Sequence, residues 1–169
     1  VWKVHLDAAQ VLERAALSSP SKERYTKSLA LSRQRLALTA LCCPPNLCWK
    51  VWLAGGRLEL CAGNTSLARR LFIRAHRVVP EKGRVSTLLE CARLEEFVGD
   101  LQLARAILLK CRCELGSDWK VWLESVMLEI RCGEPLRAID LAKQSLEIHS
   151  GTGRLWASLV QLRYFEGGE

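Results

Sequence analysis

The sequence lacks a long apolar run, and no hydrophobic stretch approaches the roughly 18 residues that a bilayer-spanning helix requires. It also lacks a signal peptide and an initiating methionine, so we expect a fragment of a longer protein. Apolar residues make up 49% of the 169 positions and charged residues 25%, a balance that excludes a disordered tail. Length and composition together predict one folded domain with a sizeable core.

The common motifs of catalysis and cofactor binding are also missing. The chain contains no G-x-x-x-x-G-K-[ST], G-x-G-x-x-G, G-x-S-x-G or H-E-x-x-H sequence. The adjacent glycines Gly55 and Gly56 lie inside a helical pattern, which indicates a close helix approach rather than a phosphate-binding loop. We therefore predict that the protein is not an enzyme and binds no cofactor.

The eight cysteines include no C-x-x-C pair, and the three histidines are scattered along the chain. Zinc sites usually show tight paired spacing, so no metal site is expected. Several cysteines stand where a helix needs a small apolar residue, which predicts reduced, buried thiols and a reducing compartment, the cytosol or the nucleus. The positions are Cys42, Cys43, Cys48, Cys61, Cys91, Cys111, Cys113 and Cys132.

Tyrosine and phenylalanine are scarce, at two and three residues, whereas tryptophan occurs six times. The tetrapeptide WKVW stands at 49–52 and again at 119–122, and a near copy, WKVH, begins at Trp2. Because tryptophan is rare, this recurrence indicates an internal repeat.

The repeat has a period of 34 to 36 residues, measured between the anchors Trp52, Leu88, Trp122 and Trp156. The first three anchors are followed at fixed offsets by glutamate, glycine and alanine. These are Glu59, Gly63 and Ala68, then Glu95, Gly99 and Ala104, then Glu129, Gly133 and Ala138. After Trp156, Gly167 keeps the register, but Arg163 replaces the glutamate.

Each copy reads as two helices. In the copy at 46–81, apolar and small residues recur at helical spacing from Trp49 to Leu60, and Gly63 suits the left-handed end of that helix. A second helix is expected to begin around Asn64–Ser66 and to end before Pro80. The small alanines let the two helices approach closely, and the tryptophans fill the space toward the next pair.

A pair of helices cannot bury both of its faces alone, so successive pairs are expected to stack into an all-α solenoid. We predict about nine helices and about 4.5 units in one domain, 1–169. The units are 1–45 (irregular), 46–81, 82–116, 117–150 and the partial unit 151–169. In the irregular unit, helices are expected from Trp2 to about Ala16 and from Lys22 to about Leu41. The expected structural anchors are Trp49, Trp52, Glu59, Ala68, Glu95, Ala104, Trp119, Trp122, Glu129, Ala138 and Trp156.

The glutamate seven residues after each anchor shares the apolar face, where an unpaired carboxylate is costly. We predict pairs within a repeat, Glu59 with Arg69 and Glu95 with Arg105. Glu129 must find another donor, because Ile139 occupies the matching arginine position. The alternative is that these groups point to solvent.

The net charge of +7 is uneven, with 14 Lys or Arg and 5 Asp or Glu in residues 1–82 against 11 and 13 in residues 83–169. A basic stripe in the N-terminal half is a candidate surface for RNA or an acidic protein, and a plain solvated face is the alternative. It comprises Arg69, Arg70, Arg74, Arg77, Lys82 and Arg84. Exposed aromatics interleaved with cations, which typify single-strand binding platforms, are missing, so protein binding ranks above RNA binding.

The repeat resembles two related families. Trp52, Gly56, Ala68, Phe72, Ala75 and Pro80 match the tetratricopeptide (TPR) pattern. The glutamate seven residues after the anchor and the Ala-Arg of the second helix, as in Ala68-Arg69 and Ala104-Arg105, are closer to the half-a-tetratricopeptide (HAT) repeat. The segments ARAILLKCR and VWLESVMLEIRCG are similar to the splicing-factor branch that bridges the tri-snRNP.

This resemblance covers roughly residues 49–167 and implies a right-handed superhelix of helical hairpins. It further implies a non-catalytic scaffold in a eukaryotic RNA-processing complex for splicing, 3′-end formation or ribosomal-RNA processing. Partner proteins, and sometimes RNA, would bind to its surface. The implied location is the nucleus, with the cytoplasm or an organelle as alternatives, and a homodimer stays open. A last helix through Trp156, Leu159 and Phe165, ending at Gly167–Gly168, is expected to present a bare stacking face to further repeats or a partner.

Overall fold

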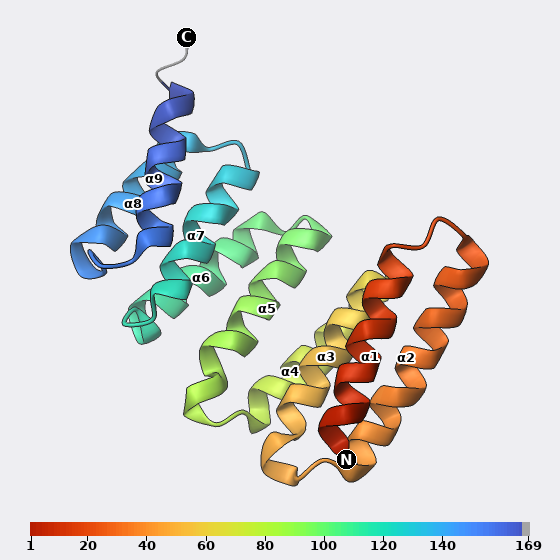
Figure 1. Ribbon diagram of the computed structural model, residues 1–169. Helices are drawn as coiled ribbons and strands as arrows, with labels where there is room; N and C mark the ends of the chain where they lie inside the picture. Colours follow the sequence, from red (N-terminus) through yellow and green to blue (C-terminus); the bar gives the residue numbers. More distant parts are fainter. Residues whose placement is uncertain (167–169) are drawn as a thin grey trace. The chain divides into compact units, whose positions relative to one another are not determined.

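The computed structural model describes residues 1–166, which fold into nine α-helices joined by short turns (Figure 1). The expected all-α class and the expected number of helices are therefore confirmed for this part of the chain. The chain divides into two compact units, Val1–Leu94 and Glu95–Glu169, and the boundary falls inside the fifth helix. No helix of the described range is long and apolar enough to cross a membrane.

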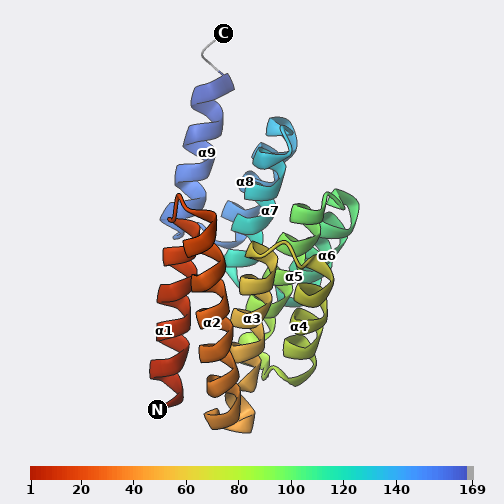
Figure 2. The same ribbon diagram turned by 90° about the vertical axis from the view of Figure 1, so that its right-hand side faces the viewer.

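The first unit contains α1 (Trp2–Leu17), α2 (Lys22–Cys42), α3 (Cys48–Cys61), α4 (Thr65–Val78) and most of α5 (Arg84–Val98). Helices α1 and α2 lie side by side as a hairpin, and α3 packs against both (Figures 1 and 2). Helices α3 and α4 form the next hairpin. The expected ends of the first two helices are confirmed to within one residue.

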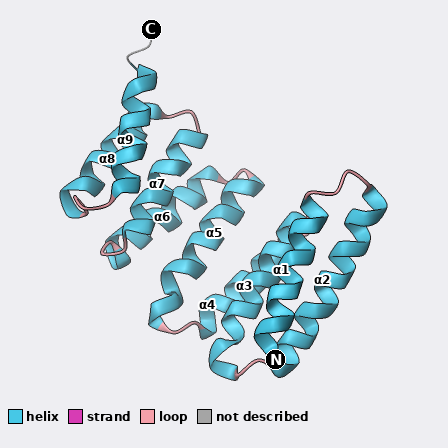
Figure 3. Ribbon diagram, viewed as in Figure 1, coloured by secondary structure: helices cyan, strands magenta, loops and turns pink. Residues whose placement is uncertain are grey.

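The second unit contains α6 (Leu101–Leu115), α7 (Trp119–Arg131), α8 (Pro135–Ile148) and α9 (Gly153–Glu166). Helix α7 packs against α6, α8 and α9, and α8 also contacts α9. All regular structure in residues 1–166 is helical, and no strand occurs there (Figure 3). The unit is thus built by the same rule as the first, with each helix touching its neighbours in sequence.

The glycine eleven residues after each of the first three anchors ends a helix. Gly63, Gly99 and Gly133 have φ angles of +80°, +92° and +73°, and no other described residue has a positive φ. Glycine occupies this left-handed region without the steric cost that a Cβ brings. Asp100 then caps α6 by accepting from the Leu103 N–H at 3.0 Å.

Small residues bring paired helices together. Ala68, Ala104 and Ala138 are fully buried, and so is Phe72. A Cβ built on Gly56 would lie only 2.2 Å from Cε1 of Phe72, whereas one on Gly55 would meet nothing nearer than 3.5 Å. The interpretation of the two glycines as a point of close helix approach is therefore confirmed for Gly56 but not for Gly55.

The tryptophans are less buried than the repeat pattern suggested. Trp49 and Trp52 are half-buried and pack against the core cluster that contains Leu53 and Phe72. Trp122 is 8% exposed and packs with Leu146 and Leu155. Trp119 is half-buried against the same cluster, whereas Trp156 is 48% exposed, because no helix in residues 1–166 covers that side of α9. The side chain of Phe165 and the expected helix end at Gly167–Gly168 lie outside the described residues.

Candidate functional site

Buried glutamates join successive hairpins. In the first unit, both carboxylate oxygens of Glu59, whose side chain is 8% exposed, accept hydrogen bonds from Arg33, at 2.7 and 2.8 Å. In the second, Glu129 accepts from Arg105 at 2.9 and 2.7 Å. The sequence had paired Glu59 with Arg69 and Arg105 with Glu95, so the predicted partners were wrong. Each arginine reaches forward to the first helix of the next pair, and we call these contacts latches.

The turn after α3 explains why the predicted pair within a hairpin does not form. The Asn64 side chain donates from Nδ2 to Glu59 Oε2 at 2.7 Å, and its backbone N–H donates to the Glu59 carbonyl at 2.8 Å. The carboxylate is thereby held at the turn with its remaining capacity facing α2. A separation of 26 residues (Arg33 to Glu59) or 24 (Arg105 to Glu129) was the sequence signal for this pairing.

The latches shift the pKa values of Glu59, Arg33 and Arg105. The hydrogen bonds from Arg33 lower the pKa of Glu59 more than burial raises it. The same contacts raise the pKa of Arg33, and Glu129 does so for Arg105. The burial and the ion pairs of Glu59 and Glu129 exclude the alternative that these two carboxylates point to solvent.

The matching position of the last junction is apolar. Ile139 stands where the other copies carry arginine, is 3% exposed and packs with Val126 and Leu162. Arg163 stands where they carry glutamate. The two departures from the repeat fall at one junction, so neither leaves a buried charge there without a counter-charge.

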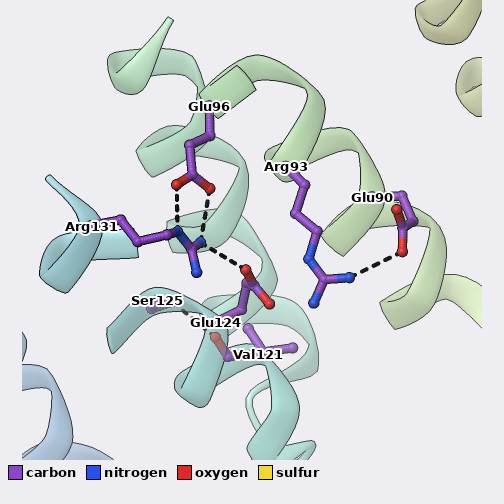
Figure 4. A network of polar contacts seen from close by, with 7 residues as sticks. All are labelled: Glu90, Arg93, Glu96, Val121, Glu124, Ser125 and Arg131. Atoms are coloured by element: carbon purple, nitrogen blue, oxygen red, sulfur yellow. Dashed lines mark hydrogen bonds and ion pairs between the residues drawn. The ribbon is translucent and has the colours of Figure 1, made fainter. Parts of the chain in front are cut away.

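Two further groups of charges are tied up in ion pairs. Arg131 of α7 donates from Nη2 to Glu96 at 2.8 Å and to Glu124 at 3.0 Å (Figure 4). In the first unit, Glu90 accepts from Arg57 at 2.7 Å and from Arg93 at 3.1 Å. These side chains form ion pairs with one another, so we do not consider them as binding sites. The candidate binding surfaces are the basic stripe and the grooves described below.

The predicted basic stripe lies along α4 and the turn that follows it. All six of its side chains are exposed: Arg69, Arg70, Arg74, Arg77, Lys82 and Arg84. The guanidinium carbon of Arg74 lies 4.2 Å from the centre of the Trp52 ring, a cation–π distance. The stripe therefore covers part of the half-buried indole as well as presenting charge to solvent.

A small groove crosses α3 between α2 and α4 in the first unit, with a volume of about 170 Å³. We call it the apolar groove, because most of its wall is aliphatic or glycine. Its lining includes Leu36, Ala37, Ala40, Gly55 and Leu71, with the Arg33–Glu59 latch at one end.

A larger groove occupies the equivalent place in the second unit, across α7 between α6 and α8, with a volume of about 470 Å³. We call it the polar groove. Leu109, Arg112, Ser125, Arg137, Asp140 and Leu141 line it, and the Arg105–Glu129 latch closes one end. Neither groove was predicted from the sequence, since the walls of each come from three successive helices and depend on how those helices pack.

Arg112 is the polar groove's distinctive group. It donates from Nη1 to the Ser125 hydroxyl at 2.7 Å, and that hydroxyl in turn donates to the Val121 carbonyl at 2.9 Å. Its guanidinium carbon lies 5.7 Å from the centre of the Trp122 ring. Burial lowers the pKa of Arg112, in contrast to the raised pKa values of Arg33 and Arg105, because no carboxylate binds it.

The cysteines are less uniformly buried than predicted. All eight are free thiols, but Cys42 and Cys113 are exposed and only Cys43 and Cys111 are buried. Burial raises the pKa of Cys111 to about 11. The expectation of buried thiols was therefore wrong for Cys42 and Cys113, because their helix faces meet no neighbouring helix among the described residues.

Comparison with known proteins gives two matches. A family model described as PRP6, TPR-like domain matches residues 1–169. A TPR-containing protein of Dictyostelium discoideum is 47% identical over 166 residues. The matched region covers 98% of this chain but spans only 12% of that relative's length.

Proposed function

The chain belongs to the PRP6 TPR-like domain family, and from this premise we propose that it is a non-catalytic scaffold of a nuclear pre-mRNA-splicing complex. In this role its helical surface holds partner proteins, and it does not itself transform a substrate. The Dictyostelium relative supports the repeat assignment over nearly the whole chain.

The observation that carries the proposal is the pairing of a rigid repeat with open grooves. The latches and the close contact at Gly56 fix neighbouring helices. The grooves across α3 and α7 are not filled by the side chains that line them. A preorganised concave surface lowers the entropy cost of binding a partner chain. Repeat proteins commonly use such extended surfaces for protein recognition.

Affinity purification tests the proposal. The tagged 169-residue chain is expressed in eukaryotic cells, recovered from nuclear extract with and without nuclease, and analysed by mass spectrometry. Splicing proteins should be recovered in both samples at similar yield. Their absence from both, or their loss after nuclease treatment, would contradict a protein-binding scaffold.

Direct RNA binding is the second candidate, and the basic stripe is the specific observation that favours it. Its six exposed cations would displace counterions from RNA, so affinity should fall steeply with salt. Filter binding of a labelled single-stranded RNA at 50 and 200 mM salt provides the measurement. Replacing Arg70 and Arg77 with glutamine should weaken binding and reduce the salt slope. The absence of binding at low salt would exclude this candidate.

A further inference from the structure

We propose that the polar groove binds an acidic segment of a partner protein, with a side-chain carboxylate held by Arg112 and a neighbouring apolar side chain on the leucines beside it. This inference rests on the scaffold function and names the kind of partner that one face of the scaffold fits.

The polar groove is large enough, and apolar enough at its base, to hold side chains of a partner. Its volume of about 470 Å³ lies within the usual range of ligand sites and accommodates more than one side chain. Leu108 and Leu128 at its base are each 2% exposed, whereas Leu109 at the rim is 54% exposed. An apolar side chain of a partner would therefore find a floor and a wall to pack against.

The polar groove contains an arginine, Arg112, that is not paired with a carboxylate of the described residues. Glu129 is fully engaged by Arg105, so the latch contributes little net charge. Among the described residues, the hydrogen bond to Ser125 is the only one that Arg112 makes, and no carboxylate pairs with it. A guanidinium carries five N–H donors, so donors remain for a ligand. Glu129 acts on Arg112 only at longer range, so a carboxylate bonded directly to the guanidinium would offset more of its desolvation.

Arg112 lies at the end of the polar groove that is away from the latch. Arg112 lies seven residues after Arg105 on α6, which places it about 10 Å further along the helix and away from Glu129. Ser125 and the Trp122 ring hold its guanidinium in place. The groove also contains an exposed carboxylate, Asp140, and an exposed cation, Arg137, on α8. Asp140 would repel an acidic ligand there, so the ligand carboxylate is expected at the Arg112 end.

The apolar groove provides an internal comparison. Counted from the latch residues, seven positions after the arginine and four before the glutamate, Ala40 takes the place of Arg112 and Gly55 the place of Ser125. The cation and the hydroxyl that orients it are therefore features of the second unit rather than of the repeat. The repeat packs in the first unit without them, which indicates that Arg112 is not required to build the fold.

Selection from a phage-displayed library of random 12-residue peptides tests the proposal on the intact 169-residue chain. Peptides with Asp or Glu next to an apolar residue should be enriched. A fluorescein-labelled selected peptide should then lose about 10- to 100-fold in affinity for Arg112→Gln, measured by fluorescence anisotropy. Lys110→Gln is the matched control, since it removes the same charge from the same helix outside the groove, and its affinity should stay within about twofold of wild type.

A peptide carrying Gln for Glu provides the same test without altering the protein, and it applies even if Arg112→Gln fails to fold. It should bind the wild-type chain about as weakly as the original peptide binds the variant. Enrichment of peptides without acidic residues, no enrichment at all, equal affinity for the variant, or displacement by single-stranded RNA but not by unlabelled peptide would overturn the proposal. If splicing proteins still co-purify with Arg112→Gln in that case, only the assignment of the groove fails and the scaffold function stands.

Discussion

The two units use the same scaffold to build grooves of different chemistry. Both place an arginine–glutamate latch at one end of a groove that crosses the first helix of a hairpin. The first groove is small and aliphatic, whereas the second has more than twice the volume and contains a half-buried cation. The comparison teaches that the anchor, glutamate, glycine and alanine positions of the hairpins at α3 and α7 are the same while the groove positions differ, because the former are constrained by packing against neighbouring helices.

The latches themselves also differ. The Arg105 side chain is 19% exposed, whereas the Arg33 side chain is 44% exposed. Among the described residues, the Glu129 carboxylate accepts side-chain hydrogen bonds from Arg105 alone, whereas Glu59 also accepts one from Asn64. The second latch is therefore better shielded from water, and its loss leaves the Glu129 carboxylate without another side-chain donor among the described residues. The interior of the second unit depends more on a single ion pair than that of the first.

The largest expected effect comes from breaking the second latch. Arg105→Ala should reduce the free energy of unfolding by about 3 kcal/mol, because it strands a buried carboxylate. Arg33→Ala should cost about half as much, since Asn64 still binds Glu59. Urea unfolding followed by circular dichroism measures both, and hydrogen exchange should localise the losses to α7 and α3. Equal losses would refute the difference between the latches. Lys110→Ala, at an exposed pair, should change stability by less than about 0.5 kcal/mol.

The next effect tests packing in the first unit with two adjacent glycines. Gly56→Ala forces a Cβ into the ring of Phe72 and should cost about 2 kcal/mol. Gly55→Ala meets only ordinary contact with Leu71 and should stabilise α3 by up to about 1 kcal/mol. Thermal unfolding distinguishes the two variants. A neutral Gly56→Ala would mean that α3 and α4 are not held at the observed separation.

A smaller effect is expected in acid, and it sharpens the contrast between the units. Because its folded pKa is lowered, Glu59 stabilises the protein above its ordinary pKa of 4.5, and that contribution is lost as pH falls below it. Arg33→Met should flatten this part of the pH profile of unfolding free energy. Exchange protection in α3, measured between pH 6 and pH 3, is the readout. An unchanged profile in the variant would contradict the latch as the source of the lowered pKa.

The smallest effect is on thiol reactivity and leaves stability untouched. At pH 8, Cys42 and Cys113 should react with a maleimide quickly, because both are exposed. Cys111 should react only as fast as the second unit opens, since it is fully buried and its pKa is raised to about 11. Peptide mapping after timed labelling gives the rates, and rapid labelling of Cys111 would show that α6 is not docked.

Much of the fold could be predicted from local signals. The left-handed glycines and the buried alanines are each determined by one residue and its immediate backbone, so their spacing in the repeat predicted them. The indoles were harder to place, because the exposure of Trp156 depends on which helices surround it rather than on its place in the repeat.

Most of the candidate site could not be predicted from the sequence, because its contacts also depend on which helices lie next to each other. The partner of Glu59 comes from a helix 26 residues earlier, and the neighbours of Arg112 come from α7. Helical periodicity gives the face of one helix, but it does not say which residue of the next helix stands opposite. Only the three-dimensional register of antiparallel helices could distinguish an arginine that binds a carboxylate, such as Arg105, from one that does not, such as Arg112.

The direction of the latches bears on how such a chain lengthens. Each second helix carries the cation and each following first helix carries the anion, so copying one whole hairpin supplies one new donor and one new acceptor in matching places. Duplication at such a boundary leaves no orphan charge. At the junction of Ile139 and Arg163 that symmetry is lost, and a copied hairpin inserted there would meet an isoleucine where its glutamate needs an arginine. A copied hairpin would therefore find a matching arginine–glutamate pair at the junctions before α8 but not at the junction after it.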